Sequence, residues 1–142
     1  MTALISLSDS VNMIMTENPV VVTPNMLMTE VVTIFANEKF RHLPVLDENG
    51  KAIGIISKSD VLQLQDKFTR FNRIGSDLVN RNYFDALMVR EVMTEDPVSV
   101  EADSQIKDLL DLFINRRLRS VVVHHRQRCV GIATPYDILT MV

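Results

Sequence analysis

The sequence is poor in the residues on which many specialised sites depend. Among its 142 residues there are one cysteine, no tryptophan and only four glycines. A lone cysteine forms neither an internal disulfide nor a thiolate metal cage, so we expect a reducing, cytoplasmic compartment. So few glycines exclude a glycine-rich phosphate-binding loop and predict mostly regular structure.

Long apolar runs are also missing. Uninterrupted apolar stretches are only a few residues long, far below the roughly 18 residues that span a bilayer. The N-terminus shows no basic region of the kind that begins a secretory signal. Hydrophobic residues make up 46%, charged residues 23%, and the net charge is -3. This composition is typical of an ordinary globular protein without membrane segments.

What the sequence does contain is an internal repeat, which decides its organisation. Identical residues lie 78 positions apart early in the two copies and 77 apart near their ends. The pairs are Met15/Met93, Thr16/Thr94, Glu17/Glu95, Pro19/Pro97, Val20/Val98, Val22/Val100, Phe35/Phe113, Arg41/Arg119, Val45/Val123, Gly54/Gly131, Ile55/Ile132, Asp60/Asp137 and Leu62/Leu139. We assign residues 8–69 to the first repeat, 89–142 to the second, and 70–88 to a partly helical linker.

The one-residue difference between the copies falls in a predicted hairpin turn. The first copy carries Asn49-Gly50, the signal of a two-residue hairpin, whereas His125-Arg126-Gln127 in the second copy lacks it. Surface turns tolerate such a change in length. The difference therefore supports homologous repeats.

Each copy predicts the order strand, helix, strand, strand, helix, which gives an α/β (α+β) fold. We expect first strands at 20–22 and 98–100, and helices whose N-caps are Asn25 and Asp103. The hairpin strands are expected at 43–46 with 52–56 and at 120–123 with 129–133, and the last helices begin near Lys58 and Pro135.

The most informative segments join the last strand of each copy to its last helix. Residues 54–60 and 131–137 both read glycine, apolar pair, hydroxyl, two variable residues, aspartate. A hydroxyl three residues before a carboxylate is typical of a structural helix cap. The same junction can also hold a phosphate near the helix start, with the aspartate accepting hydrogen bonds from ribose hydroxyls.

Taken together, these motifs resemble a tandem pair of CBS domains, the Bateman module, from about Val11 to Leu139. The resemblance rests on the Met-Thr-x-x-Pro-Val opening of both copies, the strand of residues 41–47, the Asn49-Gly50 turn, the glycine before the last strand and the closing hydroxyl-x-x-Asp. It implies two tandem β-α-β-β-α repeats packed with pseudo-two-fold symmetry. It also implies a homodimer.

The resemblance further implies that an adenosine-type ligand, such as AMP, ADP, ATP or a related adenosyl compound, binds in the cleft between the copies. The closing motif would contact ribose and phosphate, the opening segment the base, and the start of the middle strand the phosphates. The implied contacts are Thr16, Pro19, Val21, Arg41, His42, Ser57, Ser59, Asp60, Thr94, Pro97, Ser99, Arg119, Thr134, Tyr136 and Asp137. We also infer that each site combines the opening segment of one copy with the closing motif of the other.

Three other patterns could mark a site: clustered arginines, adjacent histidines near a cysteine, and abundant methionines. Five arginines lie between positions 116 and 128, which suits the phosphates of a nucleotide, a solvated surface, or a nucleic acid; the net negative charge argues against nucleic acid. His124 and His125 are adjacent on a predicted strand and point to opposite faces, so we expect no metal site with Cys129. Eight methionines fill a core or line a subunit interface.

We find no catalytic grouping and predict a stand-alone regulatory module, not an enzyme, that needs no cofactor. It senses an adenine nucleotide and signals to an effector protein whose identity the sequence does not give. Two alternatives remain: a ligand-free dimerisation or scaffold module whose motifs are only caps, and a nucleic-acid binder that uses the arginines.

Overall fold

The computed structural model describes residues 4–71 and 85–141, without the side chains of residues 67–71. The chain forms two compact units. We call Val20–Asp47 with Ile53–Glu95 the central unit, and Met1–Pro19 with Glu48–Ala52 and Asp96–Val142 the C-terminal unit. None of the helices that the structure describes is both long and apolar enough to traverse a membrane.

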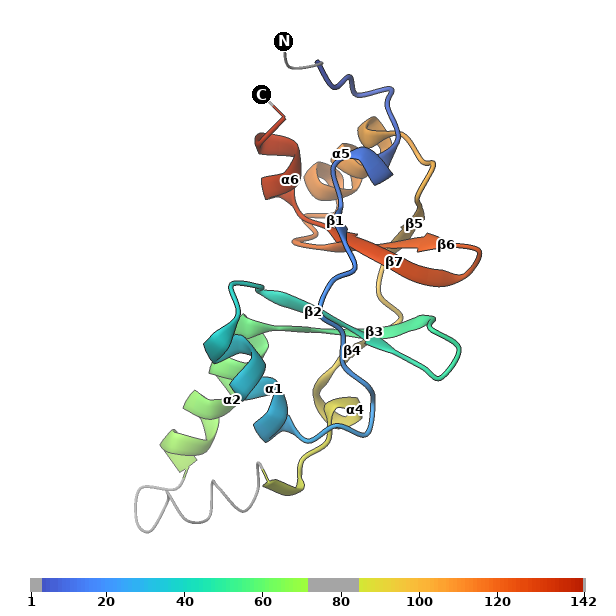
Figure 1. The fold of residues 1–142 in the computed structure, drawn as a ribbon. Helices are drawn as coiled ribbons and strands as arrows, with labels where there is room; N and C mark the ends of the chain where they lie inside the picture. The colour runs from blue at the N-terminus through green and yellow to red at the C-terminus, as the bar shows by residue number, and fades with distance from the viewer. Residues whose placement is uncertain (1–3, 72–84, 142) are drawn as a thin grey trace. The chain divides into compact units, whose positions relative to one another are not determined.

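The central unit packs helices against one face of a three-stranded sheet of order β2-β3-β4 (Figure 1). Its elements are α1 (Met28–Asn37), β2 (His42–Leu46), β3 (Ala52–Ser57), α2 (Lys58–Phe71), α4 (Val89–Val92) and β4 (Thr94–Glu95). The core lies between the sheet and the helices and includes Met28, Val31, Leu43, Val45 and Ile56. Buried and half-buried residues alternate along β3, so one face of this strand is turned to the core, whereas along β2 the three central residues Leu43, Pro44 and Val45 are all buried.

The C-terminal unit repeats this plan with a four-stranded sheet of order β1-β7-β6-β5. Its elements are η1 (Val11–Met13), β1 (Thr16–Glu17), β5 (Ser99–Glu101), α5 (Ile106–Asn115), β6 (Val121–His125), β7 (Arg128–Ala133) and α6 (Pro135–Leu139). Helices α5 and α6 cover one face of the sheet (Figure 1). The core there includes Leu109, Phe113, Val121, Val123 and Ala133.

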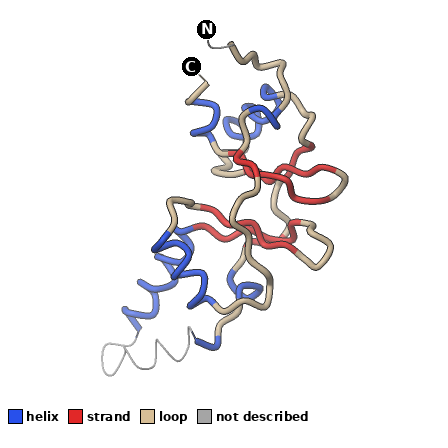
Figure 2. Tube along the Cα trace, in the orientation of Figure 1, coloured by secondary structure: helices blue, strands red, loops and turns tan. Residues whose placement is uncertain are grey.

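The compact units do not coincide with the sequence repeats, because each repeat gives its opening segment to the other. Strand β1 of the first repeat pairs antiparallel with β7 of the second. Strand β4 of the second repeat pairs antiparallel with β3 of the first. All strands, the exchanged ones included, are red in Figure 2. Strands β1 and β4 have two residues each, too few to carry a period-2 pattern, so no sequence pattern marks them.

The exchange extends to the backbone hydrogen bonds that begin α1 and α5. The N–H of Met28 donates to the Leu87 carbonyl at 2.8 Å, and the N–H of Ile106 donates to the Asp9 carbonyl at 2.9 Å. The N–H of Lys107 donates to the Leu7 carbonyl at 2.9 Å. Carbonyl groups from the exchanged segments thus satisfy donors that a side-chain cap usually serves.

The predicted N-caps Asn25 and Asp103 are therefore wrong. The N-caps are Leu27 and Gln105, and neither makes a side-chain cap hydrogen bond. A cap side chain is not needed where a neighbouring backbone segment supplies the acceptors. The predicted starts of the last helices, at Lys58 and Pro135, are confirmed.

The hairpin turns also differ from the sequence prediction. In the second copy Arg126 and Gln127 form a two-residue turn with φ angles of 51° and 68°, closed by the pairing of His125 with Arg128. In the first copy the loop runs from residue 47 to 51 and only Gly50 has positive φ, at 82°. The Asn-Gly signal thus marks the longer loop, and the two-residue turn forms without its usual residues.

Most predicted strands are confirmed to within a residue or two. The strand expected at 20–22 is reduced to a single bridge between Val22 and Val45, whereas its counterpart is β5. Most of the linker predicted at 70–88, including Ile74 and Leu78, lies outside the described residues. Leu87, at its end, is buried in the central core.

Candidate functional site

Both closing motifs form helix-capping arrangements. In the first, Asp60 Oδ2 accepts from the Ser57 backbone N–H at 3.1 Å, and Ser57 Oγ accepts from the Asp60 N–H at 3.0 Å. In the second, Asp137 Oδ2 accepts from the Thr134 N–H at 2.8 Å and lies 3.5 Å from its hydroxyl. These cap bonds use Oδ2 alone and leave Oδ1 of each aspartate outside the cap.

In the central unit the exchanged strand brings Thr94 to the first closing motif. Thr94 lies directly opposite Ile55 on β3, two residues before Ser57. Because side chains alternate along strands, Thr94 and Ser57 point to the same face of the sheet. Leu43 and Ile56 point to the core, so His42 and Ser57 share the opposite face. Three strands thus contribute polar side chains to one face.

The C-terminal unit has the same arrangement. Thr16 lies directly opposite Ile132 on β7, two residues before Thr134. Ala133 and Val123 belong to the core, so Ile132 and Thr134 face away from it. Ser99 pairs in parallel with Val122 on β6 and lies on this face as well.

A methionine from each exchanged segment packs against the glycine of the closing motif. A Cβ atom on Gly54 would overlap Met93 Sδ and lie 2.9 Å from Met93 Cγ. A Cβ atom on Gly131 would lie 2.5 Å from Met15 Sδ and 2.8 Å from the Thr16 carbonyl oxygen. Glycine therefore allows the close approach of the exchanged strand at both positions; the atoms near Gly54 all belong to the Met93 side chain, whereas those near Gly131 include a backbone oxygen.

The structure divides the predicted contacts between the two units. The C-terminal unit contains Thr16, Pro19, Pro97, Ser99, Arg119, Thr134, Tyr136 and Asp137, and the central unit contains Val21, Arg41, His42, Ser57, Ser59, Asp60 and Thr94. Each set combines opening residues of one repeat with the closing motif of the other. In the first opening segment, the residues after Pro19 lie in the central unit, which holds the closing motif of their own repeat. In the second opening segment, the residues after Glu95 lie in the C-terminal unit, which holds the closing motif of theirs.

Burial of these side chains follows their place in the fold. The aspartates and the motif hydroxyls Ser57 and Thr134 are half-buried, and the basic residues Arg41 and Arg119 are exposed. Tyr136 is 71% exposed. Burial raises the pKa of the Asp137 carboxyl, and the hydrogen bonds from Thr134 partly oppose this shift.

The backbone ties Arg41 to the first closing motif. The N–H of Lys58 donates to the Arg41 carbonyl at 2.8 Å, which places the start of β2 beside the start of α2. The corresponding residue in the second copy is Pro135, which has no N–H to donate. The two copies therefore differ in the backbone hydrogen bond at this point: Arg41 has one to the second residue after the apolar pair, and Arg119 cannot have it.

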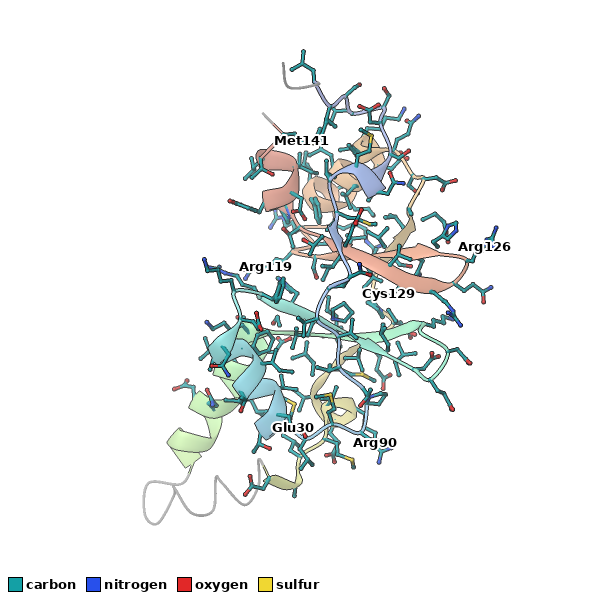
Figure 3. The ribbon with its side chains drawn as sticks, viewed as in Figure 1. Glu30, Arg90, Arg119, Arg126, Cys129 and Met141 are labelled. Carbon is teal, nitrogen blue, oxygen red and sulfur yellow. The ribbon has the colours of Figure 1, made fainter. Side chains whose placement is uncertain are left out.

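The five clustered arginines do not form one patch. Three of them precede β6, namely Arg116, Arg117 and Arg119. The other two, Arg126 and Arg128, follow this five-residue strand. Arg119 and Arg126 project from opposite ends of β6 (Figure 3). At roughly 3.3 Å per residue the strand separates the two groups by about 15 Å, so the sequence cluster is not a continuous basic surface.

A histidine and the cysteine lie opposite each other on β6 and β7. His124 pairs with Cys129 across the two strands, at a register shift. Burial lowers the pKa of His124, Glu101 raises it and Lys51 lowers it. Burial also raises the pKa of the Cys129 thiol. Within residues 4–71 and 85–141, no three His, Cys, Asp or Glu side chains gather as a metal site.

The methionines serve mainly as core residues. Met28 is fully buried, and Met15, Met26 and Met93 pack against the two cores. Met13, at 57% exposure, is the exception among the methionines near the repeat openings. No sequence pattern links Met93 to Gly54 or Met15 to Gly131, because the residues of the first contact are about 40 positions apart and those of the second about 115.

The sequence pattern of the CBS domain family matches residues 10–67 and 89–142. Among curated proteins, inosine-5'-monophosphate dehydrogenase of Methanocaldococcus jannaschii is 29% identical over 121 residues, which are 84% of this chain and 21% of the relative. The gamma-3 subunit of 5'-AMP-activated protein kinase of Sus scrofa is 27% identical over 107 residues, 75% of this chain and 20% of the relative. The chain thus spans only about a fifth of either protein.

Solved structures with the same fold cover nearly the whole chain. CBSX2 in complex with AMP has a TM-score of 0.75 and 23% identity, and the match covers 93% of this chain and 94% of that one. A CBS domain pair in complex with 5'-methylthioadenosine and S-adenosyl-L-methionine has a TM-score of 0.72 and 22% identity, over 93% of this chain and 94% of that one. Adenosine-containing molecules are thus the ligands of both structures.

Proposed function

Because the chain belongs to the CBS domain family, with two copies of the domain in tandem, we propose that it is a regulatory module that binds an adenosine-containing nucleotide. Each site is formed within one compact unit, where the closing motif of one repeat meets the opening strand of the other. The first site holds Thr94 with Ser57, Ser59 and Asp60. The second holds Thr16 with Thr134, Tyr136 and Asp137.

The strand exchange is the observation that carries this proposal. It puts Thr94 opposite Ile55 and Thr16 opposite Ile132, so a threonine of the exchanged strand lies beside each motif, exposed at Thr94 and half-buried at Thr16. The cap leaves Asp60 Oδ1 and Asp137 Oδ1 to accept hydrogen bonds from the two ribose hydroxyls. A carboxylate is suited to a vicinal diol because each oxygen has two lone pairs.

Signalling would use the coupling between ligand binding and conformation. A nucleotide that binds one arrangement of the chain more tightly shifts the population toward it by that difference in affinity. An effector protein, in a cytoplasmic setting compatible with the half-buried thiol of Cys129, would read this shift. No catalysis is part of the proposal.

We include homodimerisation in the proposal, through the outer helices of the C-terminal unit. Ile114 on α5 and Leu139 on α6 are 63% and 69% exposed, and these two helices pack against each other. Large apolar side chains in such a position suit a subunit contact. Sedimentation of wild type and of Ile114→Glu tests this, and a wild-type monomer at high concentration would refute it.

The binding test separates a ligand role from a capping role. An asparagine keeps a side-chain oxygen that accepts the cap hydrogen bond but loses the carboxylate. Asp60→Asn and Asp137→Asn should therefore stay folded, and each should lose AMP binding at its own site by at least about tenfold. Calorimetry with AMP, ATP and S-adenosylmethionine measures the loss, and circular dichroism reports the fold.

Two results would favour the scaffold alternative, in which the motifs are only caps. One is the absence of binding or thermal stabilisation by any of these ligands at millimolar concentration. The other is binding that neither aspartate variant alters, which would place the ligand elsewhere. For the nucleic-acid alternative, affinity should fall steeply with salt concentration, and the separation of the arginines argues against it.

A further inference from the structure

The two closing motifs differ in charge at the side chains that surround them. Beside Ser57 the first motif has Lys58, followed by Ser59, and the N–H of Lys58 binds the Arg41 carbonyl at 2.8 Å. Lys58 and Arg41 are exposed, and His42, the next residue on β2, shares the face of Ser57. The first junction therefore has three basic residues close to it in the backbone: Lys58 within the motif, and Arg41 and His42 at the start of the neighbouring strand.

The second motif lacks two of these three basic residues. Pro135 replaces Lys58, Ser120 replaces His42, and only Arg119 remains. Since proline has no N–H, the bond that holds Arg41 against its motif has no counterpart at Arg119. Arg119 projects from the α5 end of β6 (Figure 3).

The residue immediately before the aspartate also differs in chemical type between the two motifs. Ser59 in the first motif is replaced by Tyr136 in the second, and this tyrosine is 71% exposed. An exposed aromatic ring offers a flat apolar surface on which a purine can stack. It offers no positive charge to a phosphate.

Acidic side chains are balanced between the two sites and do not cancel this difference. Glu95 pairs with Gly54 and Glu17 pairs with Gly131, so both glutamates lie on the face opposite to Thr94, Thr16 and the motif hydroxyls. Each motif also has one aspartate. The net difference between the sites is therefore set by Lys58 and His42, which favour phosphate at the first motif only.

We propose that the two sites differ in ligand class: the motif of residues 54–60 binds adenosine phosphates, with Lys58 and Arg41 as its phosphate-binding residues, whereas the motif of residues 131–137 binds adenosyl compounds without reading a phosphate. This inference rests on the proposed function. It adds Lys58, a residue at a variable position of the motif, to the binding residues. It also makes the two sites respond to different metabolic signals.

The experiment isolates each site and compares AMP with adenosine by calorimetry. In an Asp137→Asn background, which retains the first site, AMP should bind at least about tenfold more tightly than adenosine. Adding Lys58→Gln should weaken AMP about tenfold and leave adenosine within about twofold. Glutamine keeps the backbone N–H that binds Arg41 and is a good helix former.

In an Asp60→Asn background, which retains the second site, AMP and adenosine should bind within about threefold of each other, and Lys58→Gln should change neither. Adding Pro135→Lys should create a preference for AMP. The matched control for charge is Lys107→Gln, which removes an exposed lysine at the second residue of α5. It should leave both affinities unchanged.

The outcomes distinguish this inference from the proposed function. If AMP and adenosine bind both backgrounds with the same ratio of affinities, or if Lys58→Gln weakens both ligands equally, the proposed function stands and the difference in ligand class is wrong. If no adenosyl compound binds wild type or either background, both are wrong. A preference for AMP confined to the Asp137→Asn background supports both.

Discussion

Met93 packs over Gly54 so closely that the glycine has no room for a methyl group, since a Cβ atom there would overlap Met93 Sδ. The two residues come from different repeats, and their contact fastens β4 onto β3. The same relationship joins Met15 to Gly131, with the Thr16 carbonyl oxygen as a second close neighbour. The glycine of each closing motif, which lies within β3 or β7, is therefore explained by the strand exchange.

Gly54→Ala should lower the free energy of unfolding by about 1–3 kcal/mol, because the added methyl group overpacks a fitted contact. Met93→Ala in the same chain should relieve the clash, so the double variant should lose less stability than the sum of the two single changes. Urea unfolding measures all four proteins.

Gly131→Ala with Met15→Ala is the matched control for that cycle. The Thr16 carbonyl oxygen would still lie 2.8 Å from the new Cβ atom, and a backbone atom cannot be trimmed away. The relief in this pair should therefore be smaller than in Gly54→Ala with Met93→Ala. Equal relief in both pairs would contradict the assignment of the clash to backbone at Gly131.

The two-residue turn of β6 and β7 holds two non-glycine residues in the left-handed region, Arg126 and Gln127. Such a residue costs about 1 kcal/mol relative to glycine or asparagine. Arg126→Asn combined with Gln127→Gly should raise the free energy of unfolding by about 1–2 kcal/mol, again by urea unfolding. A variant of unchanged or lower stability would show that the arginine side chain contributes more than the backbone strain removes.

His124 should make stability depend on pH. Burial lowers its pKa in the folded protein below the ordinary value of 6.5, so the unfolded chain binds the proton more readily. Stability is then complete above about pH 6.5 and is lost as pH falls from there through the lowered pKa. Its Nε2 atom is buried and has no hydrogen-bond partner among the described residues.

His124→Leu tests this dependence, since Leu46 occupies the corresponding position in the first repeat. Thermal unfolding between pH 5 and 8 should show a shallower loss of stability toward acid than in wild type. The variant should also be at least as stable as wild type at pH 7, because a buried unpartnered nitrogen is removed. An unchanged slope would mean that other groups cause the acid sensitivity.

Removal of residues 1–19 should unfold the C-terminal unit and spare the central one. The missing segment supplies β1 and the carbonyl groups of Leu7 and Asp9 that accept from the start of α5. Hydrogen exchange should show lost protection at Ile106 and Lys107 and along β7. Residues 20–47, 53–71 and 85–95, which are the described part of the central unit, should keep their protection.

A chain without residues 1–6 is the control for that truncation. It retains the acceptors at Leu7 and Asp9 and all of β1, so protection of α5 and β7 should remain. If removal of residues 1–19 left α5 and β7 protected, the exchanged segment would not be needed for the fold of this unit.

Patterns within a short window were enough to predict the repeat, most strands and the starts of the last helices. The hydroxyl and aspartate at Thr134 and Asp137, for example, predicted the start of α6. The N-caps at Asn25 and Asp103 were wrong because local propensity cannot register acceptors that arrive from a distant segment.

The sequence by itself determined that this protein consists of two copies of one element order, and which residue types stand at each junction. Only the tertiary structure decided which copy completes which. Strands β1 and β4 have two residues each, so no local period marks them, and their partners are set by packing of Met15 on Gly131 and Met93 on Gly54. Each of these contacts joins segments far apart in the chain, so no local pattern reports them, and they make the two units differ from the two repeats.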